Sequence, residues 1–177
     1  GRRTLRAMMV GAPSVGVLYE DAVFPWLREV VGEPTTASYS RRWVETPDGY
    51  VHAPNIQPVL NKPNQPVSEL PVTSLGRGMW AEVTVPHTQI FPASDTPSSP
   101  WLKDRLAYGL VPRFYYSQIL WIDDIQTNSA GQVLYRVNER YGYGDLLWAA
   151  AEAFRPLTEE DLAPIHPEVE NKKVVVD

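Results

Sequence analysis

RRWVETPDGYVHAPNIQPV, residues 41–59, contains two short aromatic strands joined by a turn and followed by a proline-rich end. The tetrapeptide TPDG at its centre predicts a hairpin, because proline presets φ and glycine tolerates positive φ. Pro54 and Pro58 exclude a helix over the second half, since neither fits a helix interior. The stretch therefore predicts two antiparallel strands that close a small β-structured unit.

A related stretch, VLYRVNERYGYGDLLWAAAEAFRPL, lies at residues 133–157. Aligning its Pro156-Leu157 with Pro58-Val59 gives one consistent register over the preceding residues. The matched pairs are Tyr50 with Trp148, Val51 with Ala149, Ala53 with Ala151, and Ile56 with Phe154. The repeat predicts two diverged copies of one small β module.

The segment DLLWAAAEAF, residues 145–154, conflicts with this repeat. Asp145 is a favourable helix N-cap, and alanine has the highest helix propensity. The matched residues of the first copy carry two prolines, which a helix would not accept. We therefore predict a strand over 147–149 and at most one helical turn over 151–154.

Alternating apolar residues and turn signals predict five strands in each copy. In the first copy they are residues 4–10, 17–19, 22–31, 41–45 and 50–52. In the second copy they are residues 79–85, 113–116, 118–125, 133–137 and 147–149. The sequence thus predicts units at 1–60 and 79–158, joined by a Pro-rich, semi-rigid connector at 61–78. Residues 159–177 are predicted to form a linker, whose final VVVD begins the first strand of a missing domain.

Composition narrows the class of protein. The chain has 177 residues, is 44% hydrophobic and carries a net charge of −5, which argues against a general nucleic-acid binder. It contains no cysteine, which excludes disulfide scaffolds, thiolate zinc sites and a cysteine nucleophile within these residues. No apolar run approaches the roughly 18 residues of a membrane span.

Five short strands, a long first loop and a one-turn helix before the last strand resemble the small SH3-like barrel. Its bacterial form commonly ends with an aromatic-Val strand, a Gly-aromatic-Val strand and a Pro-apolar end, a pattern similar to residues 41–59. The expected fold class is therefore all-β, with two small SH3-like barrels in tandem joined by a Pro-rich connector.

The whole chain further resembles the non-catalytic N-terminal region of bacterial L,D-transpeptidases of the YkuD type. The stretches that carry this resemblance are WVETPDGYVHAPNIQPV, MWAEVTVPHTQIF and LTEEDLAPIHPEVENKKVVVD. In that family the last stretch enters a catalytic domain with a Ser/Thr-His-Gly-Cys-type motif, which is absent here. The resemblance implies an accessory fragment rather than an enzyme, placed outside the cytoplasm at the cell envelope or wall. Its implied partners are peptidoglycan or its peptide stems and the missing C-terminal catalytic domain.

Catalysis within these residues is not expected. His52, His87 and His166 are far apart and share no metal-ligand spacing. The acid pairs Glu20-Asp21 and Asp123-Asp124 are neighbours in sequence, and adjacent strand residues point to opposite faces. We therefore predict no catalytic residue, no metal site and no cofactor.

Aromatic residues are the stronger binding candidates. We expect Trp43 and Trp148 to pack in cores, whereas Trp101, Tyr141 and Tyr143 lie in loops. SH3-like domains bind ligands between the long first loop and the loop before the last strands, which here are residues 92–109 and 138–145. The candidate ligand residues are Trp101, Tyr141, Tyr143 and Arg140. Packing against a neighbouring domain explains the same loop aromatics.

Three hypotheses follow for function. The first is a wall-binding or substrate-positioning region of a transpeptidase. The second is a structural spacer that packs against the catalytic domain without binding wall. The third, more remote, is a stand-alone reader of proline motifs. Arg41, Arg42, Arg136 and Arg140 serve either as contacts for wall carboxylates or as an ordinary solvated face.

Overall fold

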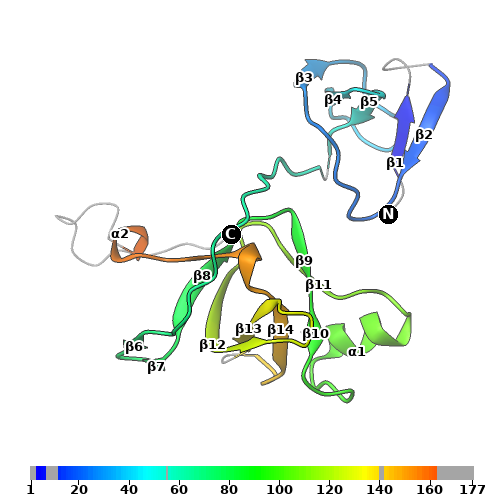
Figure 1. Cartoon of the computed structure of the whole chain (residues 1–177). Helices are drawn as coiled ribbons and strands as arrows, with labels where there is room; N and C mark the ends of the chain where they lie inside the picture. The colour runs from blue at the N-terminus through cyan, green and yellow to red at the C-terminus, as the bar shows by residue number, and fades with distance from the viewer. Residues whose placement is uncertain (1–2, 7–11, 55, 140–141, 163–177) are drawn as a thin grey trace, which may run out of the picture. The chain divides into compact units, whose positions relative to one another are not determined.

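The chain folds as two compact units, residues 1–59 and 60–177, shown in Figure 1. The structure is a computed structural model that describes residues 3–6, 12–54, 56–139 and 142–162. Strands dominate both units, so the all-β fold class is confirmed. Among the described residues, no helix is long and apolar enough to cross a membrane.

Unit 1, residues 1–59, contains one five-stranded antiparallel sheet with the strand order β2-β1-β5-β4-β3. Its strands are β1 (Arg3–Arg6), β2 (Ser14–Leu18), β3 (Arg28–Val31), β4 (Arg42–Thr46) and β5 (Gly49–His52). The hairpin predicted at TPDG is present, with Thr46 paired to Gly49. The predicted strand over 22–31 is wrong in its first part, because regular pairing begins at Arg28. Residues 7–10 of the first predicted strand lie outside the described part.

The core of unit 1 lies beneath β4 and β5. Val44 and Val51, paired across these strands, are almost completely buried. Trp43 is also buried, and its indole N–H donates to the Glu33 carbonyl at 3.0 Å. The bond satisfies the polar atom that a buried tryptophan must otherwise leave unpaired. Trp43 therefore packs inside as predicted.

Unit 2, residues 60–177, has a main sheet in the order β10-β14-β13-β12-β8-β15 and two separate strand pairs, β9 with β11 and β6 with β7. Its strands are β6 (Val72–Thr73), β7 (Gly76–Arg77), β8 (Met79–Val83), β9 (His87–Gln89), β10 (Phe91–Pro92), β11 (Arg113–Tyr115), β12 (Ile119–Thr127), β13 (Val133–Asn138), β14 (Leu146–Ala150) and β15 (Phe154–Pro156). Its helices are α1 (Pro100–Ala107), the one-turn 3-10 helix η1 (Ala151–Ala153) and α2 (Glu159–Leu162).

The predicted choice of strand over helix at residues 145–154 is confirmed. β14 alternates, with Leu147 and Ala149 fully buried and Trp148 half-buried. This two-residue period fits a strand with one face on the core. A single 3-10 turn, η1, then leads into β15. Trp148 itself lies on the outer face of the sheet, so the prediction that it packs in the core is wrong.

The two units share a three-stranded meander but differ before it. In unit 1 the meander is β3-β4-β5 and in unit 2 it is β12-β13-β14. The strand that precedes the meander pairs differently in the two units. In unit 1, β1 pairs with the last meander strand, β5, whereas in unit 2, β8 pairs with the first, β12. In unit 2 the strand that pairs with the last meander strand, β14, is β10, so β10 corresponds in position to β1 of unit 1. β10 pairs with Trp148 on β14, and β1 pairs with Tyr50 on β5. Trp148 and Tyr50 are also the residues that the sequence alignment matched.

Within the part of the chain that the structure describes, neither sheet closes into a barrel. The edge strands of unit 1 are β2 and β3, and those of unit 2 are β10 and β15, and neither pair is hydrogen-bonded. The expected closed barrels are therefore replaced by open sheets. In unit 2 the nine-residue β12 pairs with β8 over its first half and with β13 over its second. A strand shared in this way bends the sheet back over its own core without a closing ladder.

The predicted connector, residues 61–78, belongs to unit 2. Leu70 is buried in the unit 2 core, and Val67 packs against the same core. Residues 72–77 form the β6–β7 hairpin, and the Gly78 N–H donates to the Pro71 carbonyl at 2.9 Å. Composition suggested a semi-rigid connector because large apolar residues are few there, but Val67 and Leu70 are enough to pack the segment against the unit 2 core. Beyond residue 162, the predicted linker and its final strand lie outside the described residues.

Candidate ligand-binding site

The two stretches predicted to frame a groove in unit 2 are joined by the carboxylate of Asp145. Asp145 Oδ1 accepts the Ser98 backbone N–H at 2.7 Å. Its Oδ2 accepts the Ser99 N–H at 2.9 Å and the Ser99 hydroxyl at 2.6 Å. We call this three-bond contact the latch. It ties residues 92–109 to residues 138–145.

The latch also explains why α1 begins where it does. Ser99 is the N-cap, Pro100 opens the first turn, and the Ser99 side chain makes no capping bond within the helix. Its hydroxyl instead donates to Asp145, whose negative charge lies at the positive end of the helix. Leu102 is fully buried and anchors the helix in the core. The local N-cap signal at Asp145 was set aside in favour of a strand, and Asp145 instead supports the N-terminus of a separate helix, α1.

The hydrogen bonds perturb the titration of the Asp145 carboxyl. Burial raises its pKa, but the N–H groups of Ser98 and Ser99, the Ser99 hydroxyl and Lys103 outweigh that effect. The net result is a lowered pKa, because the bonds favour the ionised form. The latch is therefore ionised and intact at neutral pH.

Two of the four predicted ligand residues flank the latch on exposed surface. Trp101 lies two residues after Ser99 and is 39% exposed. Tyr143 lies two residues before Asp145 and is 62% exposed. Arg140 and Tyr141 lie outside the described residues. The structure therefore brings together the segments that carry Trp101 and Tyr143, and their role in binding stays a prediction.

The same loop holds a carboxylate oxygen that sequence analysis missed. Glu139 Oε2 is buried and has no hydrogen-bond partner in the structure, the one such side-chain atom among the described residues. The Glu139 side chain lies against Gly142, where an added Cβ would come within 3.5 Å of Oε2. A buried acceptor without a donor is uncommon in folded proteins. No local signal in the sequence distinguished Glu139 from other surface acids.

The acid pair Asp123-Asp124 does not form an acid/base dyad, though for a different reason than predicted. The register of β12 on β13 shifts between Ile122 and Asp124, which is a β-bulge. Both carboxylates therefore reach one guanidinium: Arg136 Nε donates to Asp123 at 2.7 Å, and Nη1 lies 3.2 Å from Asp124. Our expectation that they point to opposite faces was wrong, because a bulge re-aims adjacent side chains. Hydrogen bonding to Asp123 also raises the pKa of Arg136.

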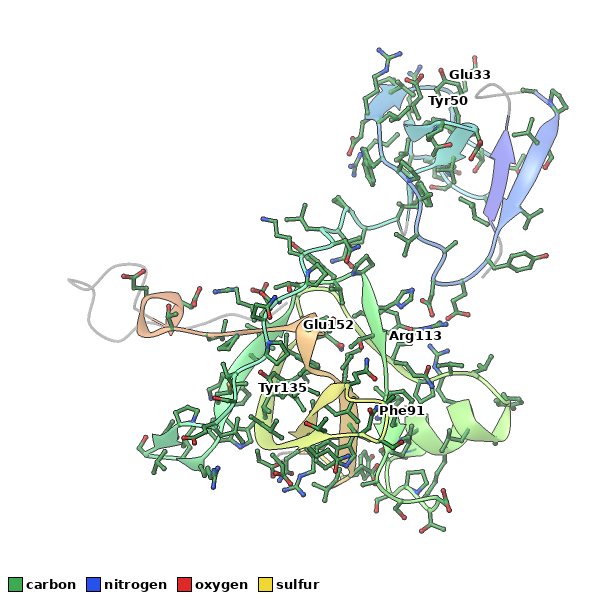
Figure 2. All side chains as sticks on the ribbon, in the orientation of Figure 1. Glu33, Tyr50, Phe91, Arg113, Tyr135 and Glu152 are labelled. Atoms are coloured by element: carbon green, nitrogen blue, oxygen red, sulfur yellow. The ribbon has the colours of Figure 1, made fainter. Side chains whose placement is uncertain are left out.

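Trp148 lies beside this charge cluster on the outer face of the sheet. Arg136 and Phe91 are its cross-strand neighbours, and the guanidinium carbon lies 5.7 Å from the indole centroid. This distance is within the range of a cation–π contact. Phe91, labelled in Figure 2, is 43% exposed at the β10 edge. Arg136 therefore has its partners within the protein: the carboxylates of Asp123 and Asp124 and the ring of Trp148.

Of the remaining predicted arginines, Arg41 and Arg42 lie in the described residues and are engaged within the chain. Arg42 makes a two-bond contact with Glu29, at 3.0 and 2.5 Å. Arg41 Nε donates to the Gly32 carbonyl at 3.0 Å. These partners favour the ordinary solvated face over recognition of wall carboxylates.

Two of the three histidines, His52 and His87, lie in the residues that the structure describes. His52 Nε2 contacts the Ser40 carbonyl at 2.7 Å, and its ring packs 5.0 Å from that of Trp43. His87 belongs to β9, and His166 lies outside the described residues. Within the part of the chain that the structure describes, no three His, Cys, Asp or Glu residues gather in a way that would hold a metal ion.

Comparison with known proteins gives no assignment. No protein-family model, no curated protein and no solved structure matches the chain.

Proposed function

We propose that this chain is a wall-binding or substrate-positioning region of an extracytoplasmic L,D-transpeptidase, built from two SH3-like modules. The proposal for the modules is supported by the shared three-stranded meander and by the single 3-10 turn before the last strand of unit 2. Matched burial supports it too: Val51 and Ala149 are both buried, as are Ala53 and Ala151. The resemblance of residues 157–177 to the transpeptidase family supports the parentage.

One observation carries the binding role: the latch joins the two stretches expected to frame a ligand groove. It sets exposed aromatic rings, Trp101 and Tyr143, within two residues of either side. Aromatic rings offer large rigid area to sugar faces or peptide stems at low entropic cost. The chain then acts as a tether that raises the local concentration of the enzyme at the wall.

Retention on purified peptidoglycan sacculi tests this proposal. We expect the wild-type chain to be retained and Trp101→Ala or Tyr143→Ala to weaken retention by about tenfold each, the value of one aromatic contact near 1.4 kcal/mol. Tyr39→Ala is the matched control, because Tyr39 is a 98% exposed ring in unit 1. Equal retention of the wild type and a charge-matched unrelated protein would reject the proposal.

The spacer function is the second candidate, favoured by the exposed apolar residues of the α1 region. Leu106, Tyr108, Leu110 and Val111 are all at least 39% exposed. A catalytic domain packed there would protect their backbone amides from hydrogen exchange. Exchange in the full-length enzyme should then be slower over residues 100–111 than in this chain alone. Unchanged exchange over those residues rules the spacer out.

A further inference from the structure

The C-terminal end of α1 and the turn that follows it form a short apolar segment, residues 106–111, which we call the apolar turn. Its sequence, LAYGLV, contains four large apolar side chains, and all of them are between 39% and 79% exposed. They are Leu106, Tyr108, Leu110 and Val111. Figure 1 shows this turn at the outer end of α1, away from the main sheet of unit 2. Exposed apolar side chains gathered on one segment often mark a site that meets a partner or a membrane.

The backbone of the apolar turn is held by its own hydrogen bonds. The Gly109 N–H donates to the Leu106 carbonyl at 3.0 Å, and the Leu110 N–H donates to the Arg105 carbonyl at 2.8 Å. Gly109 has a φ of +64°, which glycine adopts without strain. These two bonds around a left-handed glycine form a Schellman motif, a common helix ending. The residue after the glycine frequently packs back against the helix, whereas Leu110 here is exposed. The turn is therefore a fixed element that presents apolar side chains outward.

The same bonds prepare the turn to leave water. A backbone N–H that enters an apolar environment without an acceptor is strongly unfavourable, which keeps most loops in solvent. The N–H groups of Tyr108, Gly109 and Leu110 all have carbonyl acceptors on α1, and Pro112 has no N–H. The Pro112 carbonyl accepts the Ile90 N–H at 2.9 Å, which ties the end of the turn to the residue before β10. Three consecutive backbone donors of the turn are thus paired before any apolar partner arrives.

Positive charge flanks the apolar turn on both sides. In RLAYGLVPR, residues 105–113, the first and last residues are arginines and no residue is acidic. These two arginines give the segment a net charge of +2, in a chain whose net charge is −5. Segments that lie at a bilayer surface combine such positive charges, which meet anionic headgroups, with apolar residues and interfacial tyrosine. The segment therefore complements an anionic lipid surface, although the chain as a whole is acidic.

We propose that unit 2 docks on an anionic lipid bilayer through the apolar turn. The apolar side chains enter the boundary between headgroups and acyl chains, and the flanking arginines meet lipid phosphates, which the planar guanidinium binds well. The contact lies on the bilayer surface rather than across it. It goes beyond wall binding and does not rest on it. The latch lies at the N-terminal end of α1 and the apolar turn at its C-terminal end, so the two contacts use opposite ends of the helix.

A neighbouring protein domain is the other candidate occupant of this surface. The charge of the segment favours lipid, because a protein partner would have to supply acids beside both arginines, whereas anionic headgroups supply negative charge across the whole surface. A few apolar side chains and two arginines give a weak, reversible attachment, since stable anchoring needs stronger combined signals. The expected binding is therefore sensitive to lipid charge and to salt.

Co-sedimentation of the full chain with lipid vesicles tests the proposal. One set of vesicles is phosphatidylcholine alone, and the other is an equal mixture of phosphatidylcholine and phosphatidylglycerol. We expect the chain to sediment with the mixed vesicles, less with phosphatidylcholine alone, and less at high salt, which screens the headgroup charge.

Leu110→Glu places a charge in the apolar turn and should weaken binding to the mixed vesicles by about tenfold, as expected for the loss of one buried leucine. Tyr108→Glu repeats the test at a second exposed position. Val72→Glu is the matched control, because Val72 is an 84% exposed valine on β6 and receives the same charge. We expect Val72→Glu to bind as the wild type does.

Several results would overturn the proposal. A wild-type chain that stays in solution with the mixed vesicles does so, as does undiminished binding by Leu110→Glu and Tyr108→Glu. An equal loss in Val72→Glu shows that added negative charge alone explains the effect. Equal binding to both kinds of vesicle, unchanged by salt, shows that anionic lipid is not recognised.

Two further results assign the surface elsewhere and also overturn the proposal. If Leu110→Glu and Tyr108→Glu both lose the folded state by circular dichroism, the turn belongs to the packing of unit 2. Slow hydrogen exchange over residues 106–111 in the full-length enzyme without vesicles assigns the surface to the catalytic domain. Purified sacculi contain no lipid bilayer, so this test and sacculus retention can fail independently of each other.

Discussion

Replacing Asp145 by alanine is expected to release the N-terminus of α1 from the loop at residues 138–145. The substitution removes one carboxylate that accepts three hydrogen bonds, from two backbone N–H groups and one hydroxyl. Ser99 has no capping bond of its own within the helix, so no partner on α1 replaces the loss. Trp101 would then be carried on a helix with a freed end.

Two contributions set the size of the effect. Losing the cap of a helix costs about 0.5–2 kcal/mol. The Ser99 side chain is fully buried, and leaving its hydroxyl without an acceptor costs about 1–3 kcal/mol. Asp145 is only partly buried, and solvent screening reduces the value of its charge. We therefore expect a loss of about 1–3 kcal/mol for unit 2, with Asp145→Asn about half as damaging.

Urea denaturation followed by tryptophan fluorescence measures this loss as a lower midpoint with an unchanged slope. A double-mutant cycle with Ser99→Ala isolates the contact, and we expect a coupling of about 1 kcal/mol. The pH dependence has a defined sign. Because folding lowers the pKa of Asp145 below 3.8, its contribution is complete above that value and is lost as the pH falls through the folded pKa. Additive single mutants, or Asp145→Ala with wild-type stability, would refute the reasoning.

Three further predictions can be checked directly. Gly78→Ala should destabilise unit 2 by about 2–5 kcal/mol, since its Cβ would lie 2.4 Å from the Trp121 ring and 2.6 Å from the Ile122 carbonyl at φ +153°. The control Gly76→Ala, strained but in open space, should cost about 1–2 kcal/mol, and equal losses in a thermal melt would contradict the steric argument. Arg155 and Thr158 lower the pKa of Asp161 to about 2, so the α2 contact should be complete above pH 4 and lost between pH 4 and 2. Carboxyl carbon chemical shifts report that titration, and a midpoint near 4 counts against it. Trp43→Phe should cost unit 1 about 1–3 kcal/mol by removing the indole N–H bond to the Glu33 carbonyl and part of a buried ring, measured by urea melts with Trp26→Phe as control.

The short-range features of this fold were predictable from its sequence. The TPDG hairpin, all five predicted strands of unit 2 and the single turn of η1 follow from local alternation, proline placement and turn residues. At residues 145–154 local propensity favoured a helix, but the repeat alignment correctly predicted a strand. Two prolines in the matched stretch of the first copy exclude a helix there, and the two copies share the same backbone structure. Such features depend on neighbours in the chain, which the sequence displays directly.

Contacts between distant residues decided the rest. Helix α1 was not predicted, because its start is fixed by Asp145, 46 residues away, and by burial of Leu102. The shared clamp of Asp123 and Asp124 on Arg136 depends on a bulge, whose position is set by the partner strand. Residues 61–78 were predicted to be a connector because the contribution of their few apolar residues becomes visible only in contact with Tyr135 and the unit 2 core. Sequence therefore determined where the strands lie, whereas tertiary packing determined which loops are tied together and which segments join the core, since both depend on partners that local pattern cannot identify.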